Sequence, residues 1–127
     1  MPHLTIDYSA NVEQHVDIDG FCKAMHAAMV AAGMFELGGI RVRALCAQHY
    51  VVADGDPRNA YVHMSLRIGA GRTLEQRKHA GAAIFEAARD FLDGLFETPH
   101  FALSLAMDEL DPDLNWKKNS MHARLRG

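Results

Sequence analysis

The sequence predicts one α+β domain, in which a four-stranded mixed sheet carries two helices on one face. The chain has 127 residues, which is the usual size of a single domain. Its apolar residues follow the order strand, helix, strand, and the same order then repeats. Residues 2–6 read Pro-His-Leu-Thr-Ile, and residues 62–66 read Val-His-Met-Ser-Leu. We therefore interpret the chain as two fused β-α-β units that lie side by side and share one sheet.

The first unit begins with a strand over residues 2–8, where apolar and polar residues alternate. Polar residues follow, and we expect them to form a loop. A helix is predicted over residues 17–32, with the aspartate at position 17 or 19 as its N-cap and apolar residues every three or four positions. Gly33 can adopt the left-handed conformation that often closes a helix. A second strand is predicted from about residue 40 to residue 50.

The second unit begins with a strand over residues 61–68. Thr73 and Gln76 then form the T-x-x-Q pattern of a capping box, in which each side chain bonds the other's backbone N–H. The helix that follows has an apolar stripe of 3.6-residue period that includes Phe91 and ends before Pro99. Residues 101–107 alternate again and predict the fourth strand.

We treat residues 1–127 as a single domain with repeat 1 at about 2–50, repeat 2 at about 60–108 and a polar C-terminal tail over 109–127. The sheet face turned away from the helices carries a mixture of polar and apolar residues. A chain of this length has no third layer to cover that face. We therefore expect another subunit to cover it.

Composition excludes several classes of function. The chain has 13 Lys and Arg against 16 Asp and Glu, and its net charge of −3 argues against nucleic-acid binding. No apolar run approaches the roughly 20 residues of a membrane span, and the N-terminus does not resemble a signal peptide, so we expect a cytoplasmic protein. The eight histidines are at least 11 positions apart, and a local metal motif needs closer spacing, so we expect no metal. The two cysteines, Cys22 and Cys46, are interpreted as small buried thiols.

Pro2 is the first candidate for chemistry, provided that Met1 is removed. Its nitrogen would then be a terminal secondary amine, and burial or nearby cations lower the pKa of such an amine toward neutrality, where a general base works best. Arg72 follows a glycine-rich loop just before a helix N-terminus, where anions are favoured. Arg41 begins the second strand. The structural alternatives are a proline that merely starts an edge strand and two solvated surface arginines.

Four segments of the chain carry a family resemblance. They are Met1-Pro2-His3-Leu4, Gly39-Ile40-Arg41-Val42-Arg43, the stretch from Tyr61 to Gln76, and Leu110-x-Pro112-x-Leu114-Asn115. Together they resemble the 5-carboxymethyl-2-hydroxymuconate isomerases of the tautomerase superfamily, whose members have an N-terminal proline. The resemblance extends over nearly the whole chain.

The resemblance implies a tautomerase-like fold, a cofactor-independent isomerase and a homotrimer. The substrate would be a small anionic dienol with two or three carboxylates, from the catabolism of aromatic compounds. Pro2 would act as general base and then as general acid, while Arg41 and Arg72 would bind carboxylates and stabilise charge on the 2-oxo oxygen. Val62 stands in the second repeat where Pro2 stands in the first, so the chain would hold one such site.

Two other functions remain open at this point. One is a tautomerase that acts on a different 2-oxo or 2-hydroxy acid, such as phenylpyruvate. The other is a non-catalytic β-α-β-β-α-β binding module, an element order shared with RNA-recognition domains. The predicted third strand lacks the pair of base-stacking aromatic residues that those domains carry, which argues against RNA binding.

Overall fold

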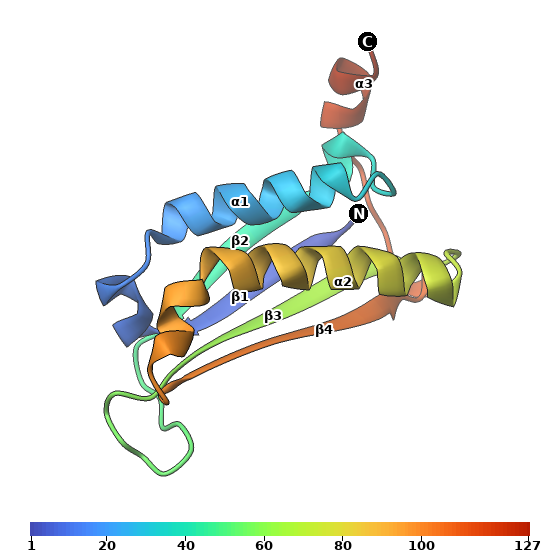
Figure 1. The fold of residues 1–127 in the computed structure, drawn as a ribbon. Helices are drawn as coiled ribbons and strands as arrows, with labels where there is room; N and C mark the ends of the chain where they lie inside the picture. The colour runs from blue at the N-terminus through green and yellow to red at the C-terminus, as the bar shows by residue number, and fades with distance from the viewer.

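The computed structural model describes all residues from Met1 to Gly127. It contains four strands, three α-helices and four short 3-10 helices (Figure 1). In chain order these are β1 (His3–Ser9), η1 (Ala10–Gln14), α1 (Ile18–Ala31), η2 (Leu37–Gly39), β2 (Arg41–Ala47), β3 (Ala60–Gly69), α2 (Leu74–Phe91), η3 (Asp93–Glu97), β4 (Phe101–Leu110), η4 (Pro112–Leu114) and α3 (Met121–Arg126).

The four strands form one mixed sheet in the order β2-β1-β3-β4. β1 is parallel to β2, β3 is parallel to β4, and β1 and β3 pair antiparallel at the centre. α1 and α2 both lie on the same face of this sheet (Figure 1). The predicted α+β fold, with a mixed sheet and two helices on one face, is confirmed.

The strand register relates the two halves of the chain. Thr5 lies directly opposite Ser65 in the antiparallel β1–β3 pair. A two-fold axis through this pair would carry each residue of β1 onto the residue 60 positions later in β3. That offset is the one at which the sequence repeats.

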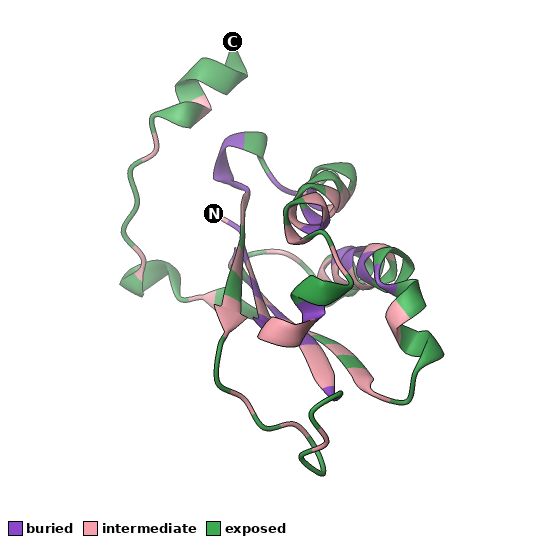
Figure 2. Ribbon diagram, turned by 90° about the vertical axis from the view of Figure 1, so that its left-hand side faces the viewer, coloured by how far each residue is buried: buried purple, intermediate pink, exposed green.

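The hydrophobic core lies between the sheet and the two helices (Figure 2). Alternate strand residues such as Leu4, Ile6 and Met64 are fully buried against the helices, because successive side chains of a strand point to opposite faces. Phe21 and Ile84 fill the same layer from α1 and α2. The packed core holds the strand ends in place.

Local signals mark the helix ends. Thr73 and Gln76 form both hydrogen bonds of the predicted capping box at the start of α2. Gly33 has a φ of +75°, as expected for the residue that follows the end of α1. Asp17 is the N-cap of α1, although its side chain makes no capping hydrogen bond.

Some predicted boundaries are wrong. β2 ends at Ala47 rather than near Tyr50, because its partner β1 ends at Ser9, which lies opposite Ala47, and no strand remains to pair with. The segment expected to be a loop after β1 is the 3-10 helix η1, which buries Val12 in the core. These corrections concern the end of the sheet where β1 and β2 finish.

The second predicted helix is also too long, because the sequence pattern lets it continue almost to Pro99. α2 ends at Phe91, whose ring is 43% exposed and packs on Phe21 with ring centroids 5.3 Å apart. The two cysteines are free and half-buried rather than fully buried. The polar C-terminal tail contains a short helix, α3, which the sequence pattern does not indicate.

The face of the sheet opposite α1 and α2 has no helix over it (Figure 1). The residues that alternate with the core positions lie on this face, among them Thr5, Arg43, His63 and Ser65. No helix of the structure is both long and apolar enough to cross a membrane.

Candidate active site

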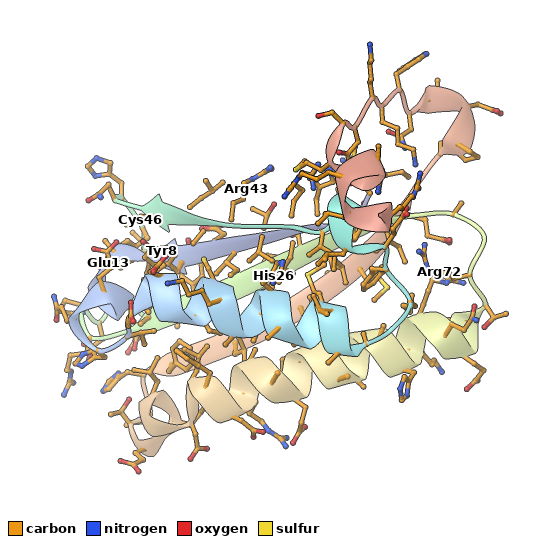
Figure 3. The ribbon with its side chains drawn as sticks, turned by 90° about the horizontal axis from the view of Figure 1, so that it is seen from above. Tyr8, Glu13, His26, Arg43, Cys46 and Arg72 are labelled. Carbon is orange, nitrogen blue, oxygen red and sulfur yellow. The ribbon has the colours of Figure 1, made fainter.

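The predicted site residues come together at one end of the sheet, where β1 and β2 begin and β3 ends. Pro2 is buried just before β1, and its carbonyl oxygen accepts a hydrogen bond of 3.0 Å from the backbone N–H of Arg41. Arg72 lies at the same end, in the loop before α2. Figure 3 shows Arg72 at the opposite end of the molecule from Tyr8, Glu13 and Cys46.

Gly39 allows the chain before β2 to lie against Pro2. A Cβ atom at position 39 would lie 3.3 Å from Cδ of Pro2 and 3.5 Å from Cγ of Met1. Carbon atoms normally pack at about 3.5–4.0 Å, so a larger residue would push on the proline ring. Gly39 therefore leaves the space that the ring of Pro2 occupies.

Arg72 is held in place by three contacts. Its Nη1 donates to the carbonyl oxygen of Gly69 at 3.2 Å, and its Nη2 donates to the carbonyl oxygen of Met34 at 2.9 Å. Its guanidinium also lies over the ring of Phe35, 5.3 Å from the centroid. An arginine has five N–H donors, so the group retains donors for an anionic ligand beyond these two bonds.

Arg41 is also fixed close to the chain start. Its Nη1 donates to the carbonyl oxygens of Gly38 and Ile40, at 2.9 and 3.2 Å. Its Nη2 lies 3.7 Å from the sulfur of Met1. Both predicted arginines are thus preorganised by backbone carbonyls.

The charges at this end act on the N-terminal amine. Burial lowers the pKa of the Met1 amine, and the positive charges of Lys117, Arg72 and Arg41 lower it further. The pKa of His3 is lowered too, by burial, by the N-terminal charge and by neighbouring arginines. Although the chain carries a net charge of −3, this end is positive and suited to an anion.

Asn119 belongs to this site and is missed by sequence reasoning. The Nδ2 of Asn119 donates to the carbonyl oxygen of Gly38 at 2.7 Å and lies 3.5 Å from the sulfur of Met1. The helix that follows is held by an ion pair, with Nη2 of Arg126 2.7 Å from Oε2 of Glu36. These contacts join residues 81 and 90 positions apart, so no local pattern could have indicated them.

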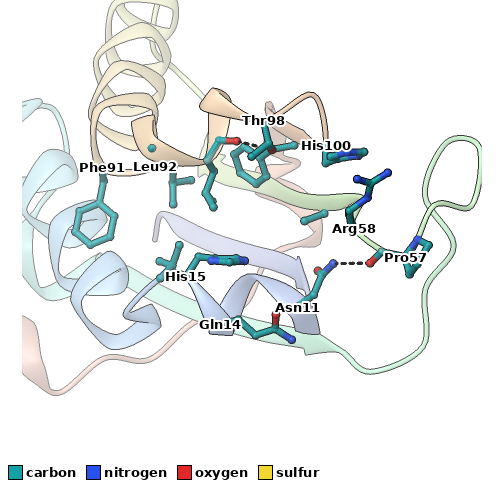
Figure 4. Close-up of a pocket in the computed structure, with 14 residues that line it drawn as sticks. Asn11, Gln14, His15, Pro57, Arg58, Phe91, Leu92, Thr98 and His100 are labelled. Atoms are coloured by element: carbon teal, nitrogen blue, oxygen red, sulfur yellow. Dashed lines mark hydrogen bonds between the residues drawn. The ribbon is translucent and has the colours of Figure 1, made fainter.

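A sizeable cavity lies away from these residues. It has a volume of about 640 Å³ and lies where β3 and β4 begin, with His15, Arg58 and His100 among its lining residues (Figure 4). Its one arginine is already engaged, because Nη2 of Arg58 lies 2.7 Å from Oδ2 of Asp56. None of the predicted site residues lines it. We place the candidate site at the cluster of cations around the chain start instead.

No three or more His, Cys, Asp or Glu side chains come together in the structure as a group that could hold a metal ion. The groups gathered around the N-terminus are cations and amide donors. Such groups bind and polarise anions, which suits chemistry on a carboxylate substrate.

Comparison with known proteins identifies the family. The family model of 5-carboxymethyl-2-hydroxymuconate isomerase matches residues 2–125. A protein of Escherichia coli named 5-carboxymethyl-2-hydroxymuconate Delta-isomerase is 40% identical over 123 residues, covering 97% of this chain and 98% of that protein.

Two crystal structures agree with this result. A 5-carboxymethyl-2-hydroxymuconate isomerase from Deinococcus radiodurans R1 is 36% identical, with a TM-score of 0.92 over 99% of this chain and 95% of that one. A second structure, described as 5-carboxymethyl-2-hydroxymuconate delta-isomerase, is 30% identical, with a TM-score of 0.89 over 98% of this chain and 93% of that one. The chain therefore belongs to the 5-carboxymethyl-2-hydroxymuconate isomerase family and is an isomerase of the tautomerase type.

Proposed function

We propose that the chain moves a proton within 5-carboxymethyl-2-hydroxymuconate or a similar 2-hydroxydienoate, with Pro2 as the acid and base and with no cofactor. The observation that carries this proposal is that Arg41, whose Nη2 lies 3.7 Å from the sulfur of Met1, and Arg72, which backbone carbonyls hold, lie at the end of the sheet where the chain starts. The E. coli relative is named for this reaction. A place in the cytoplasmic catabolism of aromatic compounds would follow, since opening an aromatic ring yields such dienoates.

The proposed base forms when Met1 is removed. While Met1 is attached, the nitrogen of Pro2 is an amide and has no basic lone pair. The burial and the positive charges that lower the pKa of the Met1 amine lie around Pro2 as well, and they would lower the pKa of the proline amine. A larger fraction of the amine is then unprotonated near neutral pH and ready to accept a proton.

The proposed reaction transfers one proton and changes no oxidation state overall. The Pro2 amine takes the proton from the 2-hydroxyl group, the C–O bond becomes a carbonyl, and the conjugated double bonds shift along the chain. The protonated amine then returns a proton to a carbon further along. Arg41 and Arg72 would hold the carboxylates and stabilise the negative charge that develops on the 2-oxo oxygen.

A homotrimer is part of the proposal. The open face of the sheet carries half-buried or exposed residues of mixed polarity, and the chain has no element left to cover it. Copies of the same chain are the simplest cover for such a face. Sedimentation equilibrium tests this, with three times the mass of one chain as the expected result and the mass of a single chain as the result that contradicts it.

The experiment on the base uses Pro2→Ala, which keeps a terminal amine but changes its basicity and geometry. Positioned acid–base groups contribute about 10²–10⁴-fold to rates, so kcat/KM should fall within that range in an ultraviolet assay of the dienol. Arg89→Ala, on the exposed surface of α2, is the control and should retain wild-type turnover. Intact Met1 in N-terminal mass spectrometry of protein from its natural source would contradict the proline mechanism.

The sequence left open a non-catalytic binding module and a tautomerase of another substrate, and these two alternatives are decided by different observations. A non-catalytic binding module is excluded by membership of an isomerase family. Phenylpyruvate has one carboxylate and would use only part of the positive charge at the site. If phenylpyruvate is turned over with a higher kcat/KM than the dicarboxylate and tricarboxylate dienols, the proposed substrate is wrong.

A further inference from the structure

Two hydrogen bonds hold the guanidinium of Arg72 at two points. Nη1 donates to the carbonyl oxygen of Gly69 at 3.2 Å, and Nη2 donates to that of Met34 at 2.9 Å. A planar group that is held at two points can still tilt about the line that joins them. A third contact is needed to fix its orientation.

The ring of Phe35 supplies this third contact. The guanidinium carbon Cζ of Arg72 lies over the ring, 5.3 Å from its centroid, within the distance of about 6 Å at which a cation is attracted to an aromatic face. The attraction acts on the positive charge as a whole. An arginine has five N–H donors and the two carbonyl oxygens use two of them, so three are not used by hydrogen bonds to the protein.

Phe35 is itself held firmly in place. It is only 9% exposed and is part of the hydrophobic core. It lies in the turn between α1 and η2, next to Met34, so the same turn provides a ring and a carbonyl oxygen to Arg72. The following residue, Glu36, is paired with Arg126, whose Nη2 lies 2.7 Å from Oε2 of Glu36. The turn is therefore held on the core side through Phe35 and on the outer side through Glu36.

We propose that Phe35 is a positioning residue for the reaction, whose ring fixes the orientation of the Arg72 guanidinium before the substrate binds. This inference rests on the proposed function, in which Arg72 holds a carboxylate and stabilises negative charge. A group that is already oriented loses less freedom when the substrate arrives, and misplacement of such a group slows a reaction. The aromatic face is the feature that matters, so tyrosine should replace phenylalanine, whereas leucine, which is apolar but has no π system, should not.

The first test is a double-mutant cycle on kcat/KM in the ultraviolet assay of the dienol. Phe35→Leu should lower kcat/KM by roughly 3- to 30-fold, the range to which the loss of a cation–π contact corresponds. In the Arg72→Ala background the same change should alter kcat/KM by less than about twofold, because Phe35 acts through Arg72. Similar losses in the two backgrounds would show a purely structural role and overturn the proposal, as would full activity of Phe35→Leu.

Two further variants control this cycle. Phe35→Tyr keeps an aromatic face and should stay within about twofold of wild type. Phe101→Leu removes the ring of another phenylalanine that packs against the core, at the opposite end of the sheet, and should keep wild-type kcat/KM. A loss in Phe35→Tyr as large as the loss in Phe35→Leu would overturn the role of the aromatic face.

The second test needs no turnover. Nuclear magnetic resonance relaxation measures the order parameter of the Nε–H bond of Arg72. The order parameter should be close to about 0.85, the value of rigid groups, in wild type and should fall toward about 0.6 in Phe35→Leu. The same order parameter in both proteins would overturn the proposal. If wild type turns over no dienol, the proposed function fails, and this measurement still decides whether Phe35 holds Arg72.

Discussion

Gly39→Ala should weaken the activity while leaving the fold nearly unchanged. The added Cβ would lie 3.3 Å from Cδ of Pro2, one of the two ring carbons bonded to the proposed catalytic nitrogen. The backbone of Gly39 does not have a positive φ, so alanine adopts it without strain. The main effect is therefore a push on the proline ring.

The size of the effect follows from this contact. Restoring a normal carbon–carbon separation of about 3.5–4.0 Å requires a shift of a few tenths of an ångström. A misplacement of about 1 Å can cost a reaction roughly 10²-fold, so a shift of this size should lower kcat/KM by about 5- to 10-fold. Overpacking costs about 1 kcal/mol, and the lower entropy of the unfolded alanine chain offsets about 0.4–1 kcal/mol of that. The free energy of unfolding should therefore change by less than about 1 kcal/mol.

The measurements are kcat/KM from the ultraviolet assay of the dienol and the free energy of unfolding from urea titration. Gly94→Ala is the matched control, because a Cβ at that position meets nothing within 4 Å. It should keep wild-type activity. Full activity in Gly39→Ala would show that the position of Pro2 does not limit the reaction, and a stability loss of several kcal/mol would show that the turn is strained by alanine.

Three further predictions concern stability. Asn59→Ala should lower the free energy of unfolding, measured by urea titration, by about 2 kcal/mol. The buried Asn59 amide forms hydrogen bonds with the loop between β2 and β3 and with His100, and both would be lost. An unchanged urea midpoint would contradict this. Thr73→Ala should lower the free energy of unfolding by about 1 kcal/mol, because it removes the capping box of α2. Circular dichroism should show a lower melting temperature for the variant, and equal melting temperatures would argue against a stabilising cap. His3 has a lowered pKa in the folded protein, so its protonation favours unfolding. Wild type should therefore lose stability relative to His3→Gln as the pH falls below about 6.5, the ordinary pKa of histidine, and a difference independent of pH would refute this.

The sequence correctly predicts which residues of α1 and β1 face the core, because the spacing of apolar residues matches the period of the element they belong to. Phe21, Met25 and Met29 follow the helical spacing of α1, and all three are fully buried. Leu4 and Ile6 follow the alternation of β1 and are also fully buried. The pattern of apolar residues is thus sufficient to predict the buried face of a helix or strand that packs on the core.

The sequence predicts less where a contact partner is distant in the chain. The length of β2 is set by where β1 ends, which the residues of β2 do not reveal. Asn119 reaches the site only because the tail folds back onto Gly38. Arg41 and Arg72 could be singled out because glycines and a helix cap mark their surroundings, and Pro2 because it follows Met1 and would become the chain start. Their catalytic and substrate-binding roles stay predictions until the variants are measured.

The contact of Asn119 with Met1 brings the C-terminal segment to the start of the chain, with α3 between this contact and Gly127. A linker from residue 127 to residue 2, with new ends opened at the exposed Gly55, would leave every strand pair in place. Such a circular permutant should fold, yet the nitrogen of Pro2 would then be a permanent amide. If the proposed mechanism is correct, the permutant would be an inactive protein with an intact architecture, since the catalytic group exists only where the polypeptide starts.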